Sequence, residues 1–280
     1  MKKYFALLLA CLLVITCFAG CGKEPAKDNS DATTTAPDAA DTVVTVGYTI
    51  YAPMNYEENG ELVGFDTELA KAVFEKLGNK VVFKLIDWDQ KYTELNSGTI
   101  QCIWNGFTAN TADDDGVARA DKVDFSYNYM GNKQVIVAKA DLAKTITDTK
   151  SLAGKVGAVE KSSAGDTYLT KTLTGAIKKG VTSQLDAMKE LSLGAVDFVV
   201  ADEQLAKAYV GKGDYAGLEI AANVYSDAEY YAIGFKKGSD LTAKVNGALE
   251  ALAADGTITN LAKKYKLENT AIVDFSDQKK

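Results

Sequence analysis

Arg119 has the most specific side-chain chemistry in this sequence. It is the only arginine among 31 basic residues. A planar guanidinium presents parallel N–H donors and therefore fits a carboxylate better than the point charge of a lysine does. Acidic residues nearby, Asp121 and the run 113–115, could instead pair with Arg119 at the surface. The residues alone leave both interpretations open, a carboxylate-binding arginine and a surface ion pair.

The chain contains no histidine. A Ser-His-Asp triad, a Cys-His pair and a histidine-ligated zinc or iron site are therefore excluded. The acidic run is not an EF-hand, because a loop beginning at Thr111 would place Lys122 where the final glutamate ligand belongs. We expect no metal and no cofactor. The net charge of −7 argues against a nucleic-acid partner, which would need a basic face.

Four other side chains lie where α/β proteins commonly place ligand contacts. Asp202 follows an apolar run and precedes a helix, and Ser163 stands at the expected start of another helix. Either could simply be a helix N-cap, because Asp and Ser are favoured there. Tyr51 and Trp88 each follow an expected strand, in loops that would face a cleft. Aromatic side chains of this size more often belong to a core, which is our interpretation of Trp104.

Hydrophobic patterns predict the elements that must position these residues. Short β-branched runs indicate strands at residues 43–48, 81–86, 100–104, 134–139, 156–159, 198–200 and 231–235. Apolar residues at helical spacing indicate helices at residues 65–77, 89–96, 183–193, 203–210, 241–252 and 258–265, with one more beginning near Ser163. Alternating strands and helices imply parallel sheets covered by helices. Two such units suggest two lobes, and a cleft between them is the expected site.

The beginning of the chain has the pattern of an export segment. Lys2 and Lys3 precede an apolar run that is too short for a permanent membrane span. The run ends in Phe18-Ala19-Gly20-Cys21, which resembles the lipobox of bacterial lipoproteins, in which the cysteine is lipidated. We expect a signal peptide at residues 1–20, lipid on Cys21 and a polar, flexible tether at residues 21–42. The alternative is an ordinary signal peptide with an incidental cysteine.

The folded part must be stabilised by its core. Cys102 is the only cysteine expected there, so an intramolecular disulfide is excluded. No later stretch is long and apolar enough to cross a bilayer.

A series of short motifs runs from Val43 to about Leu267. The motifs are Pro53, Gly64-Phe65-Asp66, Glu68-Leu69-Ala70, Trp104-Asn105-Gly106-Phe107-Thr108, Arg119 with Phe125-Ser126, Val156-Gly157-Ala158-Val159, Tyr231-Ala232-Ile233-Gly234-Phe235 and Asp255-Gly256-Thr257-Ile258. Each motif is weak alone, but their order and spacing are specific. Together they resemble the type 2 periplasmic solute-binding proteins that supply polar amino acids to ABC transporters.

The resemblance implies a two-lobed α/β fold in which each lobe is a mainly parallel sheet with flanking helices. It places lobe one at residues 43–130 and 228–270, lobe two at 131–227 and a tail at 271–280. Two hinge strands would join the lobes, near residues 129–133 and 226–230.

The resemblance also implies how each end of an amino acid would be held. Arg119, Thr108 and Ser163 would bind the carboxylate, while Asp202 and a backbone carbonyl of Asn105 or Gly106 would bind the ammonium. Both charges need partners, because burying an unpaired charge costs several kcal/mol.

Three aromatic residues, Tyr51, Trp88 and Tyr48, are the expected walls of the site. Tyr48 replaces an acidic residue of some relatives, which favours a ligand with a neutral side chain. Residues 109–118 form a longer connection before Arg119 than is usual in the family, and this insertion contains the acidic run. It could displace Arg119 from the cleft.

The function implied is capture of an L-amino acid outside the cell, by closure of two lobes that pivot at a hinge. A monomer anchored to the cell membrane through Cys21 would deliver this ligand to the permease subunits of an ABC importer. Contacts made only in the closed form would shift the population toward it. The resemblance implies a binding protein and not an enzyme. The alternatives on the same fold are an amino-acid-sensing domain and a dehydratase-type enzyme.

Overall fold

The computed structural model describes residues 42–279. The expected signal peptide, Cys21 and nearly all of the expected tether lie outside these residues. The described residues belong to one compact unit. Among the described residues, no helix has both the length and the hydropathy needed to span a bilayer.

Short strands and helices alternate along the chain. The strands are β1 (Val43–Tyr48), β2 (Tyr56–Glu58), β3 (Glu61–Val63), β4 (Lys80–Leu85), β5 (Cys102–Ile103), β6 (Asp124–Phe125), β7 (Met130–Asn132), β8 (Gln134–Lys139), β9 (Val156–Glu160), β10 (Ile177–Val181), β11 (Phe198–Asp202), β12 (Leu218–Tyr225), β13 (Glu229–Tyr231) and β14 (Gly234–Phe235). The helices are α1 (Phe65–Lys76), α2 (Lys91–Asn96), α3 (Arg119–Lys122), α4 (Ala140–Ala143), α5 (Ala164–Thr172), α6 (Gln184–Leu193), α7 (Glu203–Tyr209), α8 (Leu241–Ala254) and α9 (Thr257–Tyr265).

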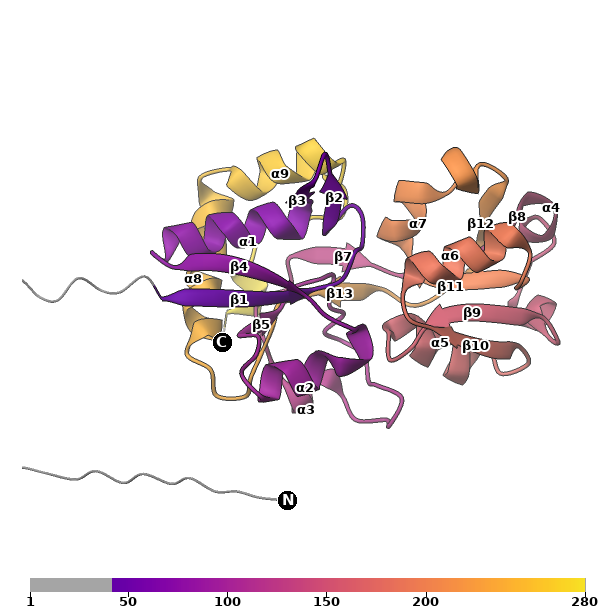
Figure 1. Ribbon diagram of the computed structural model, residues 1–280, viewed down its shortest axis with the longest axis horizontal. Coiled ribbons are helices and arrows are strands. Elements are labelled where there is room, and N and C mark those ends of the chain that lie inside the picture. Colours follow the sequence, from indigo (N-terminus) through magenta and orange to yellow (C-terminus); the bar gives the residue numbers. More distant parts are fainter. Residues whose placement is uncertain (1–41, 280) are drawn as a thin grey trace, which may run out of the picture. The chain divides into compact units, whose positions relative to one another are not determined.

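The first lobe is built on a sheet with strand order β4-β1-β5-β14-β6. Its pairs β4-β1 and β1-β5 are parallel, whereas β14 runs antiparallel to both neighbours. Helix α1 packs on β4 and contacts α8 and α9 (Figure 1). The predicted stripe of Phe65, Leu69 and Val73 along α1 is fully buried. Burial of such a stripe on the sheet supplies the free energy that holds the helix in place.

The second lobe repeats this arrangement with strand order β10-β9-β11-β8-β12. Here β10-β9 and β9-β11 are parallel, and β8 is antiparallel to β11 and β12. Helices α5 and α6 pack against β9 and β11. Ser183 caps α6 by accepting a hydrogen bond from the Asp186 amide, and Gly194 ends the helix in the left-handed conformation. Because β9 and β11 are parallel neighbours, their carboxyl ends open at the same edge of the sheet.

Two strands connect the lobes, and they pair with each other. The chain passes from the first sheet to the second through β7 and returns through β13, which is antiparallel to β7. Both run between the two groups of elements (Figure 1). The two-lobed α/β fold with paired hinge strands is therefore confirmed, and each sheet combines parallel with antiparallel pairs.

The sequence patterns missed or merged several strands. The expected strand at 231–235 is two strands, β13 and β14, which belong to different sheets. The hairpin β2-β3 was not predicted, although its turn is Asn59-Gly60, with φ of 54° and 82°. An Asn-Gly turn of this type is a strong hairpin signal. Strand β10 was missed because it lies at a sheet edge and is mostly exposed and polar.

Candidate functional site

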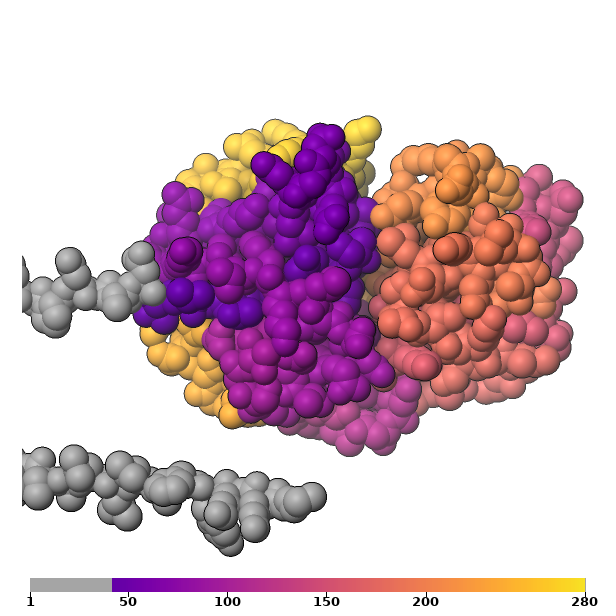
Figure 2. Space-filling view, viewed as in Figure 1, coloured from indigo at the N-terminus to yellow at the C-terminus, as the bar shows by residue number. Residues whose placement is uncertain are grey.

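A cavity lies between the two lobes, where the space-filling view shows the groove that separates them (Figure 2). It encloses about 370 Å³, including its open mouth. The lining residues of the first lobe are Thr49, Ile50, Tyr51, Trp88, Asn105, Gly106, Thr108 and Arg119. Those of the second lobe are Glu160, Ser163, Ala164, Gln184, Asp202 and Leu205. The predicted site residues other than Tyr48 all line the cavity.

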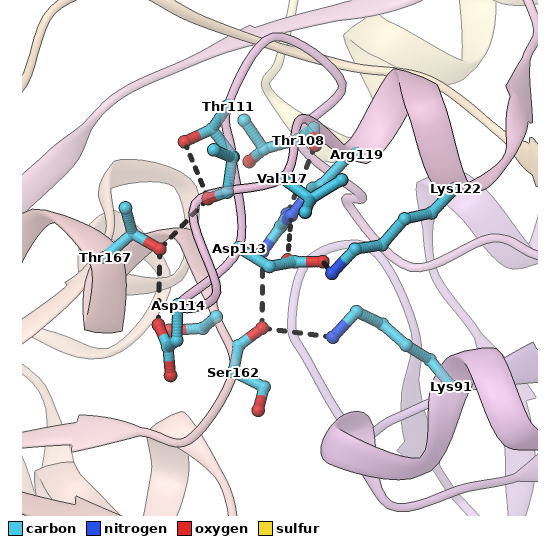
Figure 3. Close-up of polar contacts among 12 residues, drawn as sticks. Lys91, Thr108, Thr111, Asp113, Asp114, Val117, Arg119, Lys122, Ser162 and Thr167 are labelled. Atoms are coloured by element: carbon cyan, nitrogen blue, oxygen red, sulfur yellow. Dashed lines mark hydrogen bonds and ion pairs between the residues drawn. The ribbon is translucent and has the colours of Figure 1, made fainter.

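The Arg119 side chain is 1% exposed and reaches this cavity from the start of α3. Its Nε donates to Asp113 Oδ1 at 2.8 Å, and Nη1 donates to the Thr108 carbonyl at 3.1 Å (Figure 3). The guanidinium carbon lies 5.1 Å from the centre of the Phe107 ring. Although burial opposes it, the Arg119 guanidinium lowers the pKa of Asp113 to about 2. Arg119 therefore does pair with the acidic run, but the pair is buried beside the cleft and not at the surface.

The insertion before Arg119 folds back on itself as a short loop. The Asp113 amide donates to the Val117 carbonyl at 3.0 Å, and the Arg119 amide donates to the Thr111 carbonyl at 3.0 Å. Gly116 has φ of 80°, which suits a glycine in the turn. Lys122 Nζ bonds Asp113 Oδ2 at 2.9 Å and Asp115 Oδ2 at 2.8 Å. The insertion therefore directs Asp113 toward Arg119, and Arg119 is not displaced from the cavity.

One backbone carbonyl of the second lobe accepts hydrogen bonds from two cationic side chains of the first lobe. The Ser162 carbonyl accepts from Arg119 Nη2 at 3.3 Å and from Lys91 Nζ at 3.0 Å (Figure 3). Burial, with the nearby Arg119 charge, lowers the pKa of Lys91 to about 7. Ser162 has φ of 58°, a left-handed conformation that turns its carbonyl toward the first lobe. Together these two bonds connect the lobes at the rim of the cleft.

Asp202 is the last residue of β11, and its carboxylate accepts hydrogen bonds from side-chain amides. Its Oδ1 accepts from Asn132 at 2.6 Å and Gln134 at 2.7 Å, and its Oδ2 accepts from Gln184 at 2.5 Å. The same Asn132 and Gln134 amides donate to Glu229 Oε2. Burial raises the pKa of Asp202 despite these donors, and burial next to Asp202 raises the pKa of Glu229 to about 7. Asp202 precedes α7, but its side chain makes no capping bond, so the N-cap interpretation does not explain it.

The floor of the first lobe is fixed by side chains that hold the backbone. Asn105 donates to the Thr49 carbonyl at 2.9 Å and to Asn55 Oδ1 at 2.7 Å. The Gly106 amide donates to Asp66 Oδ2 at 2.8 Å. Gly106 has φ of 55°, and a Cβ there would lie 2.5 Å from the Tyr51 ring, so only glycine fits.

Two of the three expected aromatic walls line the cavity. The Tyr51 hydroxyl lies 2.6 Å from the Tyr231 hydroxyl, which fixes the orientation of its ring. The Trp88 ring packs edge-on against Phe107, with ring centres 5.3 Å apart. Tyr48 is not among the lining residues and packs edge-on against Phe83, 6.1 Å away. The predicted place of Tyr48 as a wall of the site is therefore not found in the structure.

Ser163 and Thr108 line the cavity and also have structural roles. Ser163 caps α5 by accepting a hydrogen bond from the Asp166 amide at 3.1 Å. Thr108 Oγ1 donates to Glu229 Oε2 at 3.3 Å. A fully buried Trp104 confirms our interpretation of that residue as core.

Sequence reasoning missed two polar residues of the second lobe that line the cavity, Glu160 and Gln184. Glu160 is 5% exposed, and burial together with the nearby Asp202 raises its pKa to about 8. Its place at the end of β9, beside the end of β11, was the available signal, because parallel neighbours share a carboxyl edge.

The cavity thus offers both kinds of partner that a dipolar guest needs. Arg119 lies on the first lobe, and the carboxylates of Asp202 and Glu160 lie on the second. A solute held between them would contact both lobes, so its binding is linked to the contact between lobes. Such a cleft between two hinged α/β lobes defines the class of type 2 periplasmic solute-binding proteins.

Comparison with known families agrees with this class. Residues 44–268 match the model of the bacterial extracellular solute-binding proteins, family 3. The chain belongs to this family.

Named relatives and solved structures are similar over most of the chain. The L-cystine-binding protein TcyA of Bacillus subtilis is 31% identical over 275 residues, which cover 95% of this chain and 97% of TcyA. The structure of an ancestral arginine-binding protein bound to arginine is 36% identical, with a TM-score of 0.72, and covers 80% of this chain and 97% of that one. An ancestral amino-acid-binding protein described as a precursor of cyclohexadienyl dehydratase is 28% identical, with a TM-score of 0.69, covering 80% and 94%. All three are binding proteins by name, and the third is also described as the precursor of an enzyme.

Proposed function

We propose that this protein is an extracytoplasmic lipoprotein that captures an L-amino acid in the cleft and delivers it to an ABC importer. The observation that carries the proposal is the placement of one guanidinium and one carboxylate, Arg119 and Asp202, on opposite walls of one cavity. These are the partners that the carboxylate and the ammonium of an amino acid require. The names of the relatives support the same ligand class.

Each end of the ligand would have a defined partner. The Arg119 guanidinium, with Thr108 and Ser163, would bind the ligand carboxylate. Asp202 and the backbone at Asn105 and Gly106 would bind the ammonium. Charge-assisted hydrogen bonds contribute about 1.5–3 kcal/mol each, so a few of them reach the roughly −8 kcal/mol of a micromolar complex after entropic costs.

The walls and the anchor complete the proposal. The rings of Tyr51 and Trp88 would enclose the aliphatic part of the ligand. Lobe one would comprise residues 43–130 and 228–270, and lobe two residues 131–227, moving about β7 and β13.

Lipid on Cys21 would hold the protein at the membrane near the permease subunits. Mass spectrometry of the chain isolated from the membrane fraction tests this anchor, and an unmodified Cys21 would contradict it.

The main test is thermal unfolding of residues 40–280 with each of the twenty common amino acids. A ligand at a hundred times its Kd adds about 2.7 kcal/mol to the free energy of unfolding. We expect Arg119→Ala to abolish this response, because the variant lacks the guanidinium that binds the ligand carboxylate. Lys122→Ala is the matched control: Lys122 also pairs with Asp113 but does not line the cavity.

The unliganded Arg119→Ala variant should itself be less stable, because the buried Asp113 loses a partner; removing one member of a buried pair costs about 3–5 kcal/mol. The ligand response is therefore measured against each variant's own unliganded melt. An undiminished response in Arg119→Ala would exclude the guanidinium as the clamp. Mass spectrometry of the incubated ligand separates capture from turnover of the dehydratase type.

A further inference from the structure

The charges around the cavity do not balance for a guest with only an α-amino and an α-carboxyl group. Among the lining residues, Arg119 is the one cation, and Glu160 and Asp202 are carboxyl groups. The charge of Arg119 is already matched by Asp113, at 2.8 Å and almost fully buried. The lining therefore holds two carboxyl groups that a cationic guest could pair with.

Glu160 and Asp202 differ in how they are compensated. Asp202 receives hydrogen bonds from three side-chain amides, those of Asn132, Gln134 and Gln184. Glu160 shares the Gln184 amide with Asp202, and the nearby charges of Lys91 and Arg119 offset its burial only in part. No lysine or arginine nitrogen of residues 42–279 forms a salt bridge with Glu160; the neighbouring cation Lys91 is committed to the Trp88 and Ser162 carbonyls.

A buried carboxylate without a cation is costly, and it either takes up a proton or gains a cation from a ligand. The raised pKa of Glu160 shows the cost in the unliganded cleft. The edge that Glu160 shares with Asp202 allows one guest to meet both carboxylates at once. Tyr48, whose neutrality favoured a neutral ligand, does not line the cavity and so has no bearing on this choice.

We infer that Glu160 selects amino acids with a cationic side chain, of the arginine or lysine class, by pairing with the charge at the end of that side chain. The inference rests on the proposed function, in which Arg119 and Asp202 bind the two ends common to all amino acids. A ligand of this class carries two cationic groups, one for Asp202 and one for Glu160, while its carboxylate would pair with Arg119. The aliphatic part of its side chain would lie against Trp88 or Tyr51.

The test compares arginine with citrulline, which has the same shape but a neutral urea in place of the guanidinium. Isothermal titration of residues 40–280 should give an arginine affinity about 10- to 100-fold above that of citrulline, as expected for a charge-assisted pair. Glu160→Gln keeps the size of the side chain and removes its charge. This variant should lose most of that preference while its affinity for citrulline changes little. Glu219→Gln, an exposed glutamate of the same lobe, is the matched control and should keep the preference.

Each result decides one question. Equal affinities in the unmodified protein, or a preference for arginine that Glu160→Gln leaves intact, would overturn the inference while amino-acid capture stands. If citrulline, arginine and every other amino acid fail to bind, the proposed function fails and the inference fails with it. The comparison in the unmodified protein decides the class of ligand even if Glu160→Gln does not fold.

Discussion

At the level of single residues, the carboxylate of Asp113 determines what the Arg119 guanidinium can still offer a ligand. Nε is occupied by Asp113, and Nη1 and Nη2 each donate to one backbone carbonyl. Each Nη carries a further N–H, so the outward side of the fork can still bind a carboxylate. The ion pair also fixes the side chain, because a buried, bidentate-capable group loses less rotamer freedom when it is already held. Asp113 is thus a positioning residue for the proposed clamp.

Asp66 is a buried carboxyl group that should give a measurable pH dependence of stability. Burial raises its pKa from 3.8 to about 7, even though Gly106 and Tyr129 donate to it. Between pH 3.8 and about 7 the folded state therefore holds more protons than the unfolded state, and the free energy of unfolding falls as pH rises. Asp66→Asn removes this contribution, which is on the order of 4 kcal/mol at most.

Urea unfolding of Asp66→Asn and of the unmodified protein at pH 4.5 and pH 8 measures this effect (about 1.36 kcal/mol per pKa unit). The variant should gain stability relative to the unmodified protein as pH rises. A constant difference between the two proteins across this range would contradict the assignment.

At the level of elements, the loop between β9 and α5 combines a strained residue with an important carbonyl. Ser162 has φ of 58° and uses its backbone, not its side chain, for the bonds to Arg119, Lys91 and Asp166. A residue with a Cβ in this conformation costs roughly 1–2 kcal/mol. Glycine fits the same backbone conformation without that cost.

We therefore expect Ser162→Ala to be nearly neutral and Ser162→Gly to be more stable than Ser162→Ala by about 1 kcal/mol. Thermal unfolding of the three proteins tests this order. A less stable glycine variant would show that the loss of chain entropy in the unfolded state outweighs the relief of strain.

Much of the fold was predictable from local patterns, because helices such as α1 and α6 bury one stripe and end at a glycine. The hairpin at Asn59-Gly60 was equally visible in the sequence and was overlooked. The division of residues 231–235 between β13 and β14 was not predictable locally, because partners from distant segments decide it. The same holds for the site: the sequence contains many acidic residues, and only the pairing of β9 with β11 brings Glu160 beside Asp202.

At the level of the whole molecule, the acidic insertion of the first lobe touches α5 of the second. Thr167 Oγ1 donates to the Ala112 carbonyl at 3.1 Å and lies 3.5 Å from Asp114 Oδ1 (Figure 3). Burial, and then the nearby Asp166 carboxylate, raises the pKa of Asp114. Contact between the lobes therefore brings together two acidic groups, and the insertion links closure to protonation.

The sign of this linkage follows from the direction of the shift. With the lobes apart, Asp114 would lose its neighbour Asp166 and return to its ordinary pKa, so the closed form binds protons more strongly. Lowering the pH from about 7 toward 4 should favour closure. Small-angle X-ray scattering should show a smaller radius of gyration at the lower pH.

Asp114→Asn should weaken this response, whereas Asp115→Asn, in the same loop but paired with Lys122, should keep it. Equal responses from both variants would assign the effect to other groups between the lobes, of which Glu160, whose pKa burial raises to about 8, is one candidate.

Cys102 offers a practical route to watching this motion in solution. It lies in β5 with no exposed surface, and burial raises the pKa of its thiol, so the reactive thiolate is scarce and out of reach. A fragment from residue 40 onward contains no other cysteine. Two engineered surface cysteines, one on each lobe, would accept fluorescent dyes without removal of the native one, and energy transfer between the dyes would then report single opening and closing events.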